Sequence, residues 1–261
     1  DRDKETGEID FTSAEVHQKA NPNYGVTIRP ADIMRDAMEA LNDPQQRKDF
    51  MAKSLNVFVS AINSYFDIEE FRRSNTAART LLGFEELDTV EDKLLKLAKL
   101  PIQWYGGADL SKMHDLTAAV LYGEYKGVDI IVPHCWFPVV TAHKKADEDN
   151  IPLFGWMDDG WLDMSNDAVI NHGEVVKWYK DRRGEGFKIR RIGHDRKFVR
   201  EYFLAMQKEH FPIKDQPQTF LRKSEGFRYL EASAKRGTLY YCHAEPMEYC
   251  VQNVRGIEKA D

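Results

Sequence analysis

Three apolar runs that follow one another closely constrain the fold of this chain more than any other feature. They cover residues 100–104, 116–122 and 128–132, and Lys126-Gly127 forms a turn between the last two. This pattern predicts three consecutive strands, of which the last two form a hairpin. Asp109 lies near the end of the first strand among small neighbours, where a carboxylate is exposed beside a sheet edge and open to a ligand. An aspartate that only begins a turn is the alternative interpretation.

A second acid follows a strand further along the chain. Residues 187–193 alternate apolar and polar side chains, which is typical of a strand, and His194-Asp195-Arg196 comes directly after them. An apolar helical pattern follows over residues 198–206, so the acid lies at a junction between a strand and a helix. Ligands of open α/β sheets bind beyond the carboxyl ends of parallel strands, and we therefore expect Asp195 to have a function.

The most basic window of the chain surrounds Asp195. Its side chains include Lys188, Arg190, Arg191, Arg196 and Lys197. The chain as a whole has 43 acidic and 37 basic residues and a net charge of −6, which argues against a uniformly basic nucleic-acid binder. A local basic face is still compatible with this total. The window predicts a DNA-binding track that contacts phosphates with little sequence specificity, and a solvated charged face is the alternative.

Several short motifs occur in the order that one protein family shows. The sequence Gly107-Ala108-Asp109-Leu110-Ser111, followed by Asp115-Leu116-Thr117-Ala118, resembles the first catalytic motif of the terminase large subunit of tailed phages, in its nuclease domain. The junction at Asp195-Arg196 resembles the second catalytic motif of that family. Further similarity lies at Trp156, Gly160 and Leu162, and in the Gly-Thr-Leu, His-x-x-Pro and Asn-Val sequences between residues 237 and 254.

The resemblance implies a fold and a site. The fold is α/β, with an RNase H-like mixed sheet flanked by helices over residues 96–261, preceded over residues 1–95 by a helical segment that resembles the end of the ATPase domain and the linker. Asp109 and Asp195 are the implied catalytic and metal-binding residues, for two Mg²⁺ or Mn²⁺ ions. Hydrolysis of a phosphodiester by two metal ions requires carboxylates from different strands. The family's third acid is expected at Asp261 or beyond the sequence given.

The resemblance also implies an activity and its partners. The activity is the cutting of concatemeric viral DNA by a packaging motor, and the partners are double-stranded DNA, the small terminase subunit and the portal protein. The sequence contains no Gly-x-x-x-x-Gly-Lys-Ser/Thr motif, so ATP is expected only in the full-length protein. No apolar run approaches the roughly 20 residues that span a bilayer, and no secretion signal is recognisable. We expect no membrane partner and a location in the cytoplasm of an infected host cell.

Two other functions remain open from the sequence. One is another RNase H-like nuclease, of the resolvase or transposase type, and the other is a catalytically silent DNA-binding or docking module. The histidines at 134, 143 and 172 lack metal-ligand spacing and are predicted to be structural. The adjacent acids Asp158 and Asp159 are predicted to face solvent in a turn.

Helical periodicity and composition give further expectations for individual segments. Helices are predicted over about 68–82, 91–100 and 220–235. A helix beginning near residue 30 is predicted to bury the face that carries Met34, Ala37, Met38 and Leu41. The density of prolines and aromatic residues over 133–165 predicts a loop-rich extension packed on the sheet.

Overall fold

The computed structural model describes residues 9–42, 44–57, 64–85, 89–111, 115–149, 151–195 and 200–255. Their contacts divide the chain into two compact units, one formed by residues 1–67 with 250–261 and the other by residues 68–249. In the described parts of the chain, no helix is long and apolar enough to cross a membrane.

The first unit contains three helices among its described residues. They are α1 (Ala14–Ala20), α2 (Pro30–Asn42) and α3 (Pro44–Leu55). Ile33, Ala37 and Ala40 of α2 are buried against Phe50 and Leu55 of α3. Ala37 and Ala40 are small, so the two helices can approach closely, and the face of α2 that carries these alanines is the buried one.

The buried face of α2 therefore lies one residue away from where the sequence analysis placed it. Met38 is 51% exposed and Leu41 is 40% exposed, although the helical period itself was predicted correctly.

The second unit is built on one mixed sheet. Its described strands are β1 (Trp104–Asp109), β2 (Thr117–Tyr125), β3 (Val128–Pro138), β4 (Leu162–Ser165), β5 (Ile189–His194), β6 (Ile213–Asp215) and β7 (Leu239–Tyr240). The order across the sheet is β4-β3-β2-β1-β5-β6, and β7 pairs with β3. The first three strands in sequence are antiparallel, whereas β5 is parallel to β1 and β6 is parallel to β5. The three consecutive strands and the hairpin predicted from the apolar runs are confirmed.

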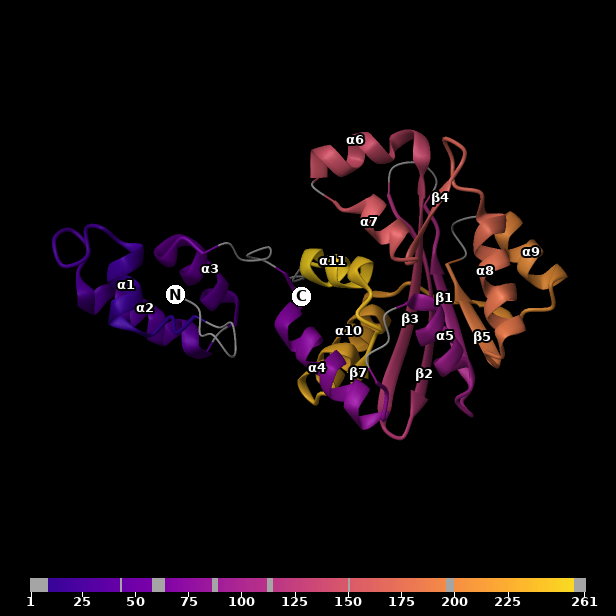
Figure 1. Cartoon of the computed structure of the whole chain (residues 1–261), viewed down its shortest axis with the longest axis horizontal. Coiled ribbons are helices and arrows are strands. Elements are labelled where there is room, and N and C mark those ends of the chain that lie inside the picture. Colours follow the sequence, from indigo (N-terminus) through magenta and orange to yellow (C-terminus); the bar gives the residue numbers. More distant parts are fainter. Residues whose placement is uncertain are drawn as a thin grey trace. The chain divides into compact units, whose positions relative to one another are not determined.

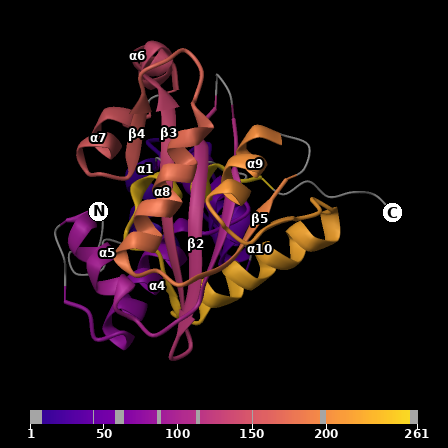
Figure 2. The same ribbon diagram turned by 90° about the vertical axis from the view of Figure 1, so that its right-hand side faces the viewer.

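Helices cover both faces of this sheet (Figure 1). They are α4 (Ile68–Leu81), α5 (Val90–Ala98), α6 (Val139–Asp149), α7 (Leu153–Asp158), α8 (His172–Glu185), α9 (Arg200–Lys208), α10 (Phe220–Lys235) and α11 (Glu245–Asn253). α8 and α9 lie on one face, in front of the sheet in Figure 2, and α4 and α10 lie on the other. The predicted mixed sheet flanked by helices and the predicted helices near 68–82, 91–100 and 220–235 are confirmed.

The predicted boundary near residue 95 lies inside the second unit. α4 is joined to the sheet by Ser74, whose hydroxyl donates to Leu239 O at 3.2 Å and accepts from Leu239 N at 2.9 Å. α5 packs beside α8, and its residues Leu94 and Leu97 belong to the core that the sheet buries. In this structure the contacts of both helices group them with the sheet.

The segment after β3 differs from the prediction of a loop-rich extension. β3 continues through Pro133 to Pro138 and is buried along its whole length, and α6, α7 and β4 follow it. β3 pairs with β7 at residues 129–130 and with β4 at residues 135–138, so residues 131–134 pair with β2 alone among the described strands. A residue without an N–H group is tolerated in a stretch that lacks a neighbour on one side.

A buried carboxylate fastens α10 to the sheet. Asp129 of β3 is 3% exposed and accepts hydrogen bonds from the hydroxyls of Tyr122 at 2.7 Å, Tyr229 at 2.8 Å and Ser233 at 2.6 Å. Burial, together with this carboxylate and the neighbouring tyrosine, raises the pKa of Tyr122 above its usual range, so the hydroxyl stays a donor. α10 therefore covers β2 and β3 on one face of the sheet.

We predict that Asp129→Ala lowers the free energy of unfolding by about 2–4 kcal/mol, because it removes the acceptor of charge-assisted hydrogen bonds. The buried hydroxyl of Ser233 then loses the carboxylate to which it donates. Urea unfolding followed by circular dichroism measures this change. Tyr229→Phe, on the exposed side of the same cluster, should cost about 1 kcal/mol or less. Equal losses in the two variants would contradict this account of the cluster.

Candidate nuclease site

The two predicted acids lie at the same edge of the sheet. Asp109 is the last residue of β1, and Asp195 directly follows β5. β1 and β5 are parallel, and Ala108 and His194 are their last paired residues. Each acid is the residue that follows this pair in its own strand. Asp109 is exposed and Asp195 is half-buried. The structure thus places the two acids at the carboxyl ends of neighbouring parallel strands.

The close pairing of β1 with β5 depends on a residue without a side chain. A Cβ atom at Gly106 would lie 2.8 Å from Cγ1 of Ile192 and 2.9 Å from Cε1 of Tyr179, so only glycine fits there. Tyr179 of α8 also donates its hydroxyl to Gly107 O at 2.7 Å and to Val120 O at 3.2 Å. α8 therefore holds β1, the strand that ends in Asp109, in place from one face of the sheet.

The loop after Asp109 is held at both of its described ends. Ser111 N donates to Oγ1 of Thr117 at 2.9 Å, and this hydroxyl donates back to Ser111 O at 3.1 Å. His172 Nε2 donates to Ser111 O at 2.9 Å. Ser111 and Thr117 of the first motif thus have a structural role, because they hold the ends of this loop together. His172 has the structural role that was predicted for it.

A pocket of about 330 Å³ adjoins Asp195 on the face of the sheet opposite α8. Its lining comes from β1, β5 and the segment after β6, and consists of Tyr105, Gly106, Gly107, Ala108, Arg191, Gly193, His194, Asp195, Gln216 and Gln218. Side chains alternate along a strand, so Arg191 shares this face with Asp195. The register of β5 against β1 shifts between Ile189 and Arg191, so this alternation does not extend to Lys188 and Arg190, and neither of them lines the pocket. Of the described residues in the basic window, the structure brings only Arg191 into the pocket. Arg196 and Lys197 lie outside the described residues.

His194 was not singled out by the sequence analysis. Its ring is 4% exposed and packs against Tyr202 and Phe203 of α9. Burial lowers the pKa of His194, against the opposing effect of the carboxylates of Asp215 and Asp195. The side chain of His194 is therefore neutral at physiological pH. No motif or residue spacing in the sequence pointed to this histidine.

The oxygen atoms of the two acids suit a divalent cation. Mg²⁺ and Mn²⁺ prefer hard oxygen ligands, and the carboxylates of Asp109 and Asp195 are of that kind. Among the described residues, no group of three or more histidine, cysteine, aspartate or glutamate side chains is arranged to hold a metal ion. The two acids thus fit part of such a site, and the predicted third ligand, Asp261, lies outside the described residues.

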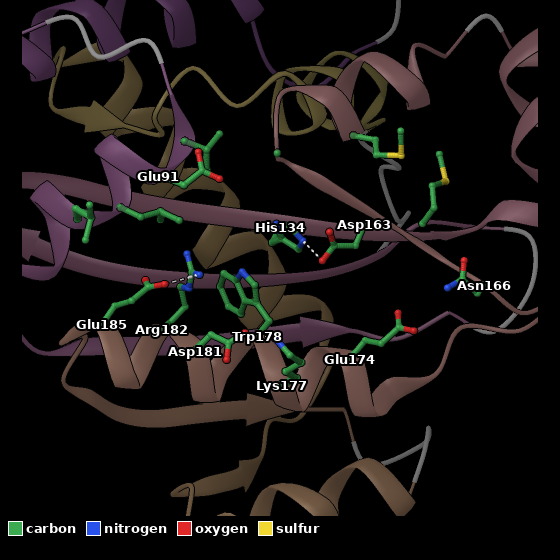
Figure 3. Close-up of a pocket in the computed structure, with 16 residues that line it drawn as sticks. Glu91, His134, Asp163, Asn166, Glu174, Lys177, Trp178, Asp181, Arg182 and Glu185 are labelled. Carbon is green, nitrogen blue, oxygen red and sulfur yellow. Dashed lines mark hydrogen bonds and ion pairs between the residues drawn. The ribbon is translucent and has the colours of Figure 1, made fainter.

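A second pocket, of about 850 Å³, lies between α5 and α8 on the other face (Figure 3). Its charges are largely paired within the chain: His134 Nε2 lies 3.0 Å from Asp163 Oδ2, and Arg182 lies 2.7 Å from Glu185. The hydrogen bond from His134 lowers the pKa of Asp163. His134 therefore has a structural partner, as expected, and we do not place the nuclease site in this pocket.

Two further sequence expectations concern possible metal ligands. Asp158 and Asp159 are exposed at the end of α7, which agrees with the prediction of solvent-facing acids in a turn. His143 packs against the ring of Phe154 at 4.5 Å between ring centroids.

Comparison with known proteins assigns the chain to a family. Residues 9–260 match the family model for the endonuclease domain of the terminase large subunit. The chain belongs to this family. The resemblance that the sequence motifs suggested is therefore confirmed, and the mixed sheet described above is the RNase H-like sheet of the terminase nuclease.

This chain spans about half or less of the length of the relatives that it matches. The large terminase subunit of Enterobacteria phage HK97 is 28% identical over 170 residues, which cover 65% of this chain and 30% of that protein. Protein YmfN of Escherichia coli K12 is 22% identical over 258 residues, which cover 95% of this chain and 53% of that protein. The crystal structure of the HK97 large terminase matches 97% of this chain and 49% of its own, with a TM-score of 0.59 and 23% identity, and shows the same fold.

Neighbouring glycines of β1 in this terminase chain should respond differently to an added methyl group. We predict that Gly106→Ala lowers the free energy of unfolding by about 1–3 kcal/mol, because its Cβ overlaps Ile192 and Tyr179. Gly107→Ala should leave stability unchanged or slightly raised, because no atom lies within 4 Å of its Cβ position. Thermal and urea unfolding of the two variants measure the difference, and a larger loss at Gly107 would contradict the packing described.

Proposed function

We propose that this chain is a metal-dependent DNA endonuclease of a viral genome-packaging motor, which cuts concatemeric DNA by two-metal hydrolysis of a phosphodiester. The observation that carries the proposal is the placement of Asp109 and Asp195 at adjacent carboxyl ends of the parallel strands β1 and β5. Membership of the terminase endonuclease family supports it.

The chemistry assigned to the site follows from its donors. Asp109 and Asp195 would bind the divalent ions, Mg²⁺ or Mn²⁺, through their carboxylate oxygens. When bound, such ions activate the attacking water and neutralise charge on the leaving oxygen. Arg191 lies on the same face as Asp195 and would bind a phosphate of the DNA, while Lys188, Arg190, Arg196 and Lys197 remain predicted DNA-binding residues that contact phosphates elsewhere.

Several parts of the proposal concern the longer protein. We assign ATP hydrolysis to the full-length terminase, together with the small terminase subunit and the portal protein as partners. Double-stranded DNA is the proposed substrate, and the cytoplasm of an infected host cell is the proposed place of action. The third metal-binding carboxylate is proposed at Asp261 or beyond it.

A docking module without catalysis is the second candidate function. It is favoured by the described residues, among which no group of three or more acids, histidines or cysteines is arranged to hold a metal ion. Such a module would bind DNA equally well with and without Mg²⁺, and its binding would not change with Asp109→Asn.

We predict that the chain nicks supercoiled plasmid DNA in Mn²⁺, and that Asp109→Asn and Asp195→Asn each reduce the rate at least about 100-fold, because each removes a charged ligand. Gel electrophoresis of the plasmid over time measures the rate, with EDTA as the metal-free control. Asp158→Asn is the matched control, since it removes an exposed acid far along the chain at the end of α7.

Equal nicking by wild type and Asp195→Asn would show that the second carboxylate is assigned wrongly. If wild type does not nick, a longer chain is the next sample. Activity regained there would support the third acid beyond the present sequence, and continued inactivity would favour the docking module.

A further inference from the structure

The pocket beside Asp195 extends back along β1 and β5 to a tyrosine and an arginine. Tyr105 pairs with Arg191 across the two strands, Gly107 pairs with Gly193, and Asp109 and Asp195 follow. These pairs share one face of the sheet because side chains alternate along each strand. The Tyr105–Arg191 pair is four residues from the acids, which is about 13 Å at the usual rise of a strand.

The floor between the two ends is open because no side chain fills it. A Cβ at Gly107 would meet no atom within 4 Å, and a Cβ at Gly193 would make only ordinary contact with Gln216, at 3.4 Å. Tyr229 ties α10 to β2 and β3, and the pocket lies beside it over β1 and β5. A ligand can therefore approach the backbone of β1 and β5 closely.

The groups at the far end of the pocket are available for a ligand. Tyr105 is 44% exposed, although it is a large aromatic residue in the middle of a sheet. Arg191 is also exposed, and within the described part of the chain no hydrogen bond or ion pair of its guanidinium is found. An exposed ring beside a free guanidinium suits a nucleotide, because bases stack on aromatic rings and arginine binds phosphate.

We infer that this pocket binds one unpaired nucleotide of the strand to be cut, with its base stacked on Tyr105 and a phosphate on Arg191. The inference rests on the proposed nuclease function and extends it, because it names the form of the DNA at the site. A pocket of about 330 Å³ is of the size that a small ligand such as a single nucleotide occupies. Stacking on Tyr105 also requires a base whose face is free, as in a single strand or a frayed duplex. Tyr105 is thus a positioning residue that sets where the strand lies relative to Asp195.

The test is the binding of a fluorescently labelled oligothymidylate of about ten nucleotides and of a matched duplex, measured by anisotropy without divalent metal so that no cutting occurs. Tyr105→Ala should weaken binding of the single strand by about 5- to 100-fold, as expected for the loss of one base stack. Tyr105→Phe keeps the ring and should bind like wild type. Tyr125→Ala, in the same sheet at the β2–β3 hairpin, is the matched control and should also bind like wild type.

A side chain that fills the floor of the pocket at Gly107 gives an independent test. Gly107→Val places a branched side chain in open space, so the protein should keep its thermal stability while single-strand binding falls at least about tenfold. Arg191→Gln should reduce the slope of log affinity against log salt concentration by about one phosphate contact.

The outcomes separate this inference from the nuclease proposal. Unchanged single-strand binding in Tyr105→Ala or in a folded Gly107→Val overturns the inference, as does a loss in Tyr105→Phe as large as in Tyr105→Ala. Duplex binding that is as tight and as dependent on Tyr105 overturns the unpaired nucleotide. If plasmid nicking depends on Asp195 while oligonucleotide binding ignores Tyr105, the nuclease stands and this inference falls. If binding depends on Tyr105 but no chain nicks, the nucleotide site stands and the nuclease proposal falls.

Discussion

The parallel pairing of β1 with β5 is the constraint on which the site depends. These strands are far apart in sequence, and their register alone brings Asp109 next to Asp195. The pairing requires the bare backbone of Gly106 against Ile192 and Tyr179. A shift of register by one residue would turn one acid to the opposite face. Packing in the core, rather than any contact between the acids, therefore determines whether the carboxylates act together.

The two faces of the sheet have different roles because of the same alternation. On one face, α8 buries its aromatic residues, and the charged groups of the large pocket there are paired with each other. On the other face, hydrogen bonds tie α10 to β2 and β3, and the pocket beside Asp195 lies over β1 and β5. The proposed site lies in this pocket, where Arg191 and Tyr105 have room for a ligand.

Local patterns predicted much of the fold and the position of both acids at strand ends, and non-local packing explains what they missed. The strands around Asp109 and Asp195 were predictable because apolar runs and alternation are properties of neighbouring residues. The buried face of α2 was placed one residue away, because the partner helix selects it. Pro133 suggested a loop, since the sequence does not reveal that β3 lacks a second neighbour there. Arg191 lines the pocket and Arg190 does not, at a shift in the register of β5 against β1 that a basic window does not reveal.

The central claim is that the carboxylates of Asp109 and Asp195 jointly hold a divalent metal ion. The most direct measurement is an anomalous difference map from crystals of this chain grown in Mn²⁺. The account predicts a peak between the two carboxylates, within about 2.0–2.6 Å of an oxygen atom of each. A map with no peak at this edge of the sheet, or with Mn²⁺ bound instead at another group of acids, would contradict it.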